Sequence, residues 1–154
     1  MAVGLKQLEM AQSVELVAAE LYRLLAAKFV SGGPIATTFE NLAKEEDQHA
    51  LRIQMLRSQV SRRPMDFRQD LDLSNIEALL EEAHMLRELF AQDAFRPTTA
   101  EAKRFMIELE NRFYEAHAQV IVTMENEDLR GFFRSLAEQD RAHAKLLQQL
   151  LEDS

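Results

Sequence analysis

The chain has 154 residues, 47% of them hydrophobic and 29% charged, with a net charge of −8. We therefore expect one globular domain over residues 1–154. Its acidic balance argues against nucleic-acid binding, and the absence of cysteine excludes disulfides, thiolate zinc sites and a built-in rubredoxin-type iron centre. No apolar run reaches the roughly 20 residues of a membrane span, and the start lacks a signal peptide's apolar core, so we expect a cytoplasmic protein.

The first half of the chain predicts two long helices. Amphipathic periodicity extends from about residue 6 to residue 30 and ends at the breaker Ser31-Gly-Gly-Pro34. A second helix is predicted from about residue 35 to residue 61, before another proline-containing stretch.

The second half predicts a shorter helix and two more long ones. After an irregular segment at 61–72, a helix is expected from Ser74 to about residue 94. A third long helix is expected from residue 99, after threonines suited to capping, to about residue 124. The fourth should run from 129 to 151, after a polar turn.

The lengths of the connections predict how these helices are arranged. Short turns indicate two antiparallel hairpins, residues 6–61 and 99–152. Residues 62–98 are long enough to travel back along helices of about 37 Å, and they contain an additional helix. The predicted fold is an all-α four-helix bundle, in which a long crossover joins two hairpins.

A repeated motif gives the strongest functional signal. The segment LAKEEDQHA of the second helix returns as LAEQDRAHA in the fourth long helix. Each copy places a carboxylate three residues before a histidine: Glu46 before His49, and Asp140 before His143. Side chains at this spacing lie on one helix face, so each pair can bind one metal ion from a rigid element.

The other two long helices also direct a carboxylate inward. Glu15 lies within an apolar stripe that includes Tyr22, whereas Glu20 falls on the other side. Glu110 lies among apolar residues, whereas Glu108 shares a polar face.

Four carboxylates and two histidines are thus predicted to face one interior. Desolvated carboxylates must be protonated, paired or metal-bound, and no inward lysine or arginine is evident at their level. A structural hydrogen-bonded network is the alternative to a metal centre. The donor set suits iron or manganese, and zinc is also possible.

Three further histidine and tyrosine positions need separate interpretation. Glu81 and His84 have the same spacing, but Glu81 points away from the apolar face, so the pair is assigned to the surface. His117 follows Glu110 by two turns, as Tyr22 follows Glu15. It could support a ligand through a hydrogen bond, bind metal itself, or be a core histidine, and Tyr22 is a second candidate for such support.

The combined pattern resembles the ferritin-like di-iron carboxylate proteins over essentially the whole chain. The spacing Glu15-x6-Tyr22, the LAKEEDQH run and the helical crossover most resemble the rubrerythrin-like group, here without a rubredoxin domain. The resemblance implies two iron ions with these ligands: Glu15, Glu46, His49, Glu110, Asp140 and His143. Bridging carboxylates would include Glu46 and Glu110 or their counterparts.

Three positions depart from the family pattern. Asp140 stands where the family usually has the longer Glu, and Phe113 stands where a further Glu is expected. His117 occupies the place that Tyr22 has in the first half. The redox behaviour could therefore differ from that of a standard rubrerythrin-like peroxidase.

The resemblance implies an oxidoreductase that reduces peroxide or dioxygen with electrons from an external donor protein, working as a homodimer. Ferroxidase activity with iron binding or storage of the ferritin type is the alternative. A third possibility is a metal-free interaction module.

Overall fold

The computed structural model describes residues 3–62, 74–123 and 126–153. These residues form five α-helices and no strand. The helices are α1 (Val3–Ala26), α2 (Pro34–Arg62), α3 (Ser74–Phe90), α4 (Thr99–Thr123) and α5 (Glu127–Glu152). The all-helical class predicted from the sequence is confirmed.

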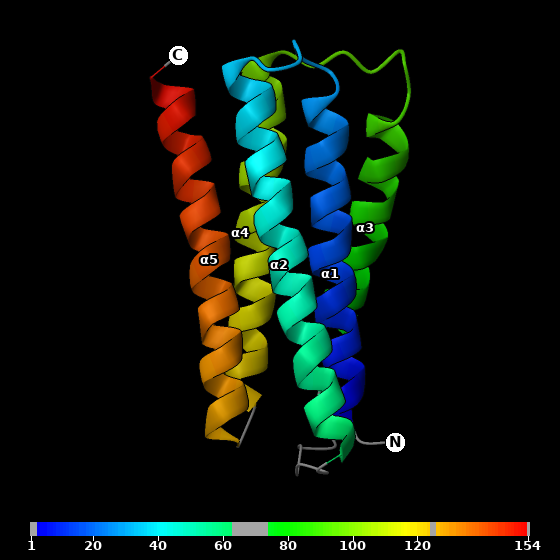
Figure 1. Cartoon of the computed structure of the whole chain (residues 1–154), viewed down its shortest axis with the longest axis vertical. Helices are drawn as coiled ribbons and strands as arrows, with labels where there is room; N and C mark the ends of the chain where they lie inside the picture. The colour runs from blue at the N-terminus through cyan, green and yellow to red at the C-terminus, as the bar shows by residue number, and fades with distance from the viewer. Residues whose placement is uncertain (1–2, 63–73, 124–125, 154) are drawn as a thin grey trace.

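The helices pack in pairs. α1 packs along α2, and α4 packs along α5, with the two helices of each pair running in opposite directions (Figure 1). The turn between α1 and α2 contains Gly32 at a φ of 76°, a backbone conformation that favours glycine. α3 lies beside α1 and also contacts α4 (Figure 1). The link from α2 to α3, where the predicted crossover would begin, lies outside the described residues.

Two helices end four residues earlier than predicted. α1 ends at Ala26 instead of residue 30, and α3 ends at Phe90 instead of residue 94. The nitrogen of Lys28 bonds to the carbonyl of Leu25 at 3.0 Å, a tighter turn than an α-helix. The side chain of Lys28 then donates to the Gln92 carbonyl at 2.7 Å, which ties the two helix ends together.

The starts of α4 and α5 follow capping chemistry. The Glu101 nitrogen donates to the Thr98 hydroxyl, and the Thr98 nitrogen donates to the Glu101 carboxylate, both at 3.1 Å. These contacts lower the pKa of Glu101. The side chain of Asn126 caps α5, which therefore begins two residues before the predicted start. The turn predicted before α5 falls partly on residues 124–125, which are not described.

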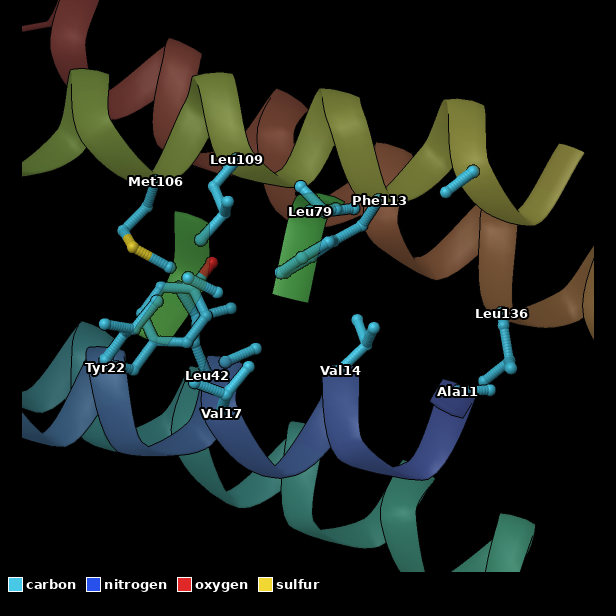
Figure 2. Close-up of a cluster of buried hydrophobic side chains, with 14 of the residues drawn as sticks. Ala11, Val14, Val17, Tyr22, Leu42, Leu79, Met106, Leu109, Phe113 and Leu136 are labelled. Atoms are coloured by element: carbon cyan, nitrogen blue, oxygen red, sulfur yellow. The ribbon is translucent and has the colours of Figure 1, made fainter. Parts of the chain in front are cut away.

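The core lies between the helix pairs. Figure 2 shows Met106 and Leu109 of α4 pointing toward Tyr22 of α1. Phe39 and Phe133 are also fully buried, and each such side chain contributes roughly 1.5–3 kcal/mol through removal from water. None of the described helices is long and apolar enough to cross a membrane.

Candidate metal centre

Each of the four long helices buries ionisable side chains against its partners. They come from α1 (Glu15), α2 (Glu46 and His49), α4 (Glu110 and His117) and α5 (Asp140 and His143), and all are at most 5% exposed. Each side chain lies on a face otherwise made of apolar residues, so packing of those faces carries the polar groups inward. The i, i+3 spacing places His49 beside Glu46 on α2, whereas the packing of the helices brings His117 and His143 beside carboxylates of other helices.

The first group of potential ligands joins α1 and α2. Nδ1 of His49 lies 3.5 Å from Oε2 of Glu15 and 3.6 Å from Oε2 of Glu46. The three side chains offer donor atoms within 4.8 Å of one another, which is close enough to bind one ion.

The second group joins α2, α4 and α5. Nδ1 of His143 lies 2.8 Å from Oε1 of Glu46 and 3.5 Å from Oε1 of Glu110. This group also meets the 4.8 Å limit. Glu46 therefore belongs to both groups, with Oε2 facing His49 and Oε1 facing His143, as a carboxylate between two ions would.

The third group contains Glu15, His117 and Asp140. Nδ1 of His117 and Oδ2 of Asp140 share a hydrogen bond of 2.7 Å. Asp140 thus meets His117 in the core, and among the described residues it forms no such group with His143, the histidine one turn after it. Of the roles that the sequence left open for His117, this contact fits hydrogen-bond support of a ligand, and its place in the third group fits metal binding.

Tyr22 reaches the same centre from α1. Its hydroxyl donates a 2.8 Å hydrogen bond to Oε1 of Glu110. Both side chains are fully buried, so this bond fixes the carboxylate without help from bulk water. Burial also raises the pKa of Tyr22, and the Glu110 carboxylate adds to that rise.

Without cations the carboxylates disfavour one another's charge. Burial raises the pKa of Glu15 to about 8, and the Glu46 carboxylate adds to the rise. Burial likewise raises the pKa of Asp140 well above its usual value, with Glu15 contributing next.

The histidines respond in two different ways. Burial alone would lower the pKa of His49, but contacts with Glu15 and Glu46 raise it to about 10. For His143 burial again acts downward, and its carboxylate neighbours raise the pKa to about 11. Burial lowers the pKa of His117, which favours the neutral imidazole.

The hydrogen bonding of these side chains fits metal binding. Among the described residues, the following buried atoms have no hydrogen-bond partner, although several lie close together: both carboxylate oxygens of Glu15 and Glu46, Oε2 of Glu110, Oδ1 of Asp140, and Nδ1 of His49 and His143. Unsatisfied buried polar atoms are costly, and cations would satisfy all of them together. Two divalent cations would also neutralise four ionised carboxylates.

The side chains assigned to the surface lie there. Glu20 and Glu108 are exposed, as are Glu81 and His84 on α3. Glu20 pairs with Arg87 at 3.1 Å.

Two residues at the centre were missed from the sequence. Nε2 of His49 bonds to Oε1 of Gln139, and Nε2 of His143 lies 3.0 Å from Oε2 of Glu45. Both missed residues directly precede a candidate ligand, and that adjacency within the repeated motif was the available signal.

Comparison with known proteins places the chain in a family. Neither the curated proteins nor the solved structures gave a significant match. The rubrerythrin family model matches residues 6–151, nearly the whole chain. The chain belongs to the rubrerythrin family.

Proposed function

We propose that this protein is a di-iron oxidoreductase that reduces hydrogen peroxide or dioxygen with electrons from a separate donor protein. The observation that carries the proposal is Glu46, whose two oxygens face two separate buried groups of potential ligands. Membership of the rubrerythrin family supports a metal-binding carboxylate centre. Iron fits the mixed carboxylate and imidazole donors, which manganese or zinc would also accept.

In this proposal the six side chains predicted from the sequence hold two ions. Glu15 and His49 would bind one ion, Glu110 and His143 would bind the other, and Glu46 would bridge them. Asp140 would supply a further ligand through Oδ1, which has no hydrogen-bond partner among the described residues.

The metal would supply redox chemistry, because two iron ions that each lose one electron match the two-electron reduction of peroxide to water. The protein's own contribution is to orient ligands and exclude water. The Tyr22 hydroxyl holds Glu110, and the buried rings of Phe39, Phe113 and Phe133 belong to the surrounding core. A dry, preorganised site favours the intended reaction over side reactions.

The proposal also covers the crossover between the helix pairs, the oligomeric state and the cellular location. We propose a ferritin-like bundle in which α3 forms part of the crossover between the hairpins. The contacts of α3 with α1 and α4 support this placement. We also propose a homodimer that works in the cytoplasm.

The test is rapid mixing of the protein, loaded anaerobically with two ferrous ions per chain, with hydrogen peroxide. Stopped-flow absorbance should show oxidation that is faster than that of free ferrous iron under the same conditions. Glu46→Gln changes the one carboxylate shared by both groups, so this variant should lose the faster oxidation. Oxidation no faster than that of free iron would reject the peroxidase proposal, while uptake of many more ions per chain would favour iron storage.

A further inference from the structure

Each of the two paired histidines is held from both sides of its ring. Nδ1 of His49 faces Glu15 and Glu46, while Nε2 bonds to Gln139. An amide oxygen only accepts hydrogen bonds, so Nε2 of His49 must carry a proton and donate it to Gln139. Nδ1 is then the nitrogen that could bind a metal ion together with the carboxylates.

His143 repeats this arrangement with a different outer partner. Its Nδ1 faces Glu46 and Glu110, and its Nε2 lies 3.0 Å from the carboxylate of Glu45. The two rings are nearly parallel, with centroids 6.0 Å apart and planes inclined by 13°.

The support is reciprocal between the helices. Glu45 of α2 contacts the histidine of α5, and Gln139 of α5 contacts the histidine of α2. Each residue stands directly before a candidate ligand carboxylate on its own helix. One helix therefore both offers a carboxylate to the centre and orients the imidazole of the other.

The two outer partners differ in charge. A carboxylate that accepts the outer N–H makes an imidazole a stronger donor through its other nitrogen than an amide does, because the bond is charge-assisted. The Glu45 side chain is 52% exposed, so water weakens its influence. The side chain of His143 is only 6% exposed, which preserves the difference at the nitrogen itself.

We propose that Glu45 and Gln139 are positioning residues that make the two metal positions unequal. The position at His143, supported by a carboxylate, binds a divalent cation more tightly and fills first. The position at His49, supported by an amide, fills second. This inference rests on the proposed dinuclear centre and goes beyond it, because it assigns an order of loading and the residues that set it.

The experiment is an anaerobic titration of the metal-free full chain with cobalt(II), followed by calorimetry and by visible absorption. The wild type should bind two ions in two separable steps. Glu45→Gln should weaken the first step about tenfold or more and leave the second unchanged, in line with outer-partner substitutions at other metal sites. Gln139→Glu should strengthen the second step.

Single-position variants assign each step to a histidine. With His143→Ala the remaining cobalt should bind with the weaker constant, and adding Gln139→Glu should tighten it. With His49→Ala the remaining cobalt should bind with the tighter constant, and adding Glu45→Gln should weaken it.

Glu40→Gln is the matched control for Glu45→Gln, because it removes one exposed charge from α2, and Gln148→Glu is the matched control for Gln139→Glu, because it adds one exposed charge to α5. Thermal unfolding of each metal-free variant checks that the helices remain folded. Equal constants for both wild-type steps, or the same shift in Glu45→Gln and Glu40→Gln, would overturn the inference. A wild type that binds no cobalt would overturn the dinuclear centre itself.

Discussion

His117 and Asp140 share a hydrogen bond of 2.7 Å between Nδ1 and Oδ2, and both side chains are almost fully buried. The bond occupies one oxygen of Asp140, while Oδ1 has no hydrogen-bond partner among the described residues. Glu46, by contrast, directs both of its oxygens toward other candidate ligands. The hydrogen bond to His117 thus leaves Oδ1 as the oxygen of Asp140 that could bind a metal ion.

Replacing His117 with Phe should therefore weaken metal binding. Asp140 would lose the partner that orients it, and substitutions of this kind reduce affinity about 10- to 100-fold at other metal sites. Cobalt(II) titration of the metal-free variant measures the change. His117→Gln is the control, because its amide can donate to the same oxygen and should retain more of the affinity. Unchanged affinity in the Phe variant would leave His117 as an ordinary core residue.

Substitution of Glu46, which belongs to both groups, should lower the metal content of the protein more than substitution of a residue that belongs to one group. Glu46→Gln should lower the content from two ions per chain to less than one, because it alters both groups. Glu110→Gln alters only the group that contains His143, so about one ion should remain. Elemental analysis after reconstitution and desalting gives these ratios. Equal losses in the two variants would contradict a shared role for Glu46.

The inward carboxylates were predictable because helical periodicity fixes the direction of a side chain relative to its own helix. The apolar stripe around Glu15 and the polar face of Glu108 were enough to separate buried from exposed acids. The spacing of Glu46 and His49 likewise follows from one helix alone. For this reason the sequence located the candidate ligands on their helices and rejected Glu81.

Contacts between helices were harder to predict, because they depend on how each helix is rotated and shifted against its neighbour. The adjacency of Glu45 and Gln139 to candidate ligands marks both residues on their own helices, but it does not predict that Glu45 meets His143 or that Gln139 meets His49 across the bundle. The predicted ends of α1 and α3 were wrong for a related reason. α1 stops early where Lys28 bonds to a carbonyl of a distant segment, an interaction that local propensity cannot represent.

Tyr22 should contribute to stability through its bond to Glu110. Tyr22→Phe keeps the ring in the core but removes the hydroxyl that donates to Oε1 at 2.8 Å. Loss of a buried hydrogen bond to a charged group lowers the free energy of unfolding by roughly 1–3 kcal/mol. Urea denaturation measures this change, with the second tyrosine as control: Tyr114→Phe alters a partly exposed hydroxyl 3.3 Å from Arg141 and should cost less.

The metal-free protein should lose stability as the pH rises from 7 to 10. Burial raises the pKa of Glu15 from 4.5 to about 8, and carboxylate neighbours raise the pKa of His49 from 6.5 to about 10. Both groups bind more protons in the folded state than in the unfolded state within this range, so the free energy of unfolding falls with rising pH. The pKa of His117 is lowered, so it acts in the opposite direction only below about pH 6.5. Urea denaturation at pH 7, 8.5 and 10 without metal measures the slope.

Glu15→Gln separates this stability effect from metal binding. A neutral amide at a position only 1% exposed removes one carboxylate that must otherwise ionise inside the bundle. The metal-free variant should therefore be more stable than the wild type at pH 9, by about 1 kcal/mol or more. It should also bind cobalt(II) less tightly, because one ligand has lost its charge. Ionised Glu15 should destabilise the metal-free protein, and a bound cation would offset that cost. A variant that is less stable than the wild type at pH 9 would contradict this prediction, because it would show that Glu15 stabilises the metal-free fold.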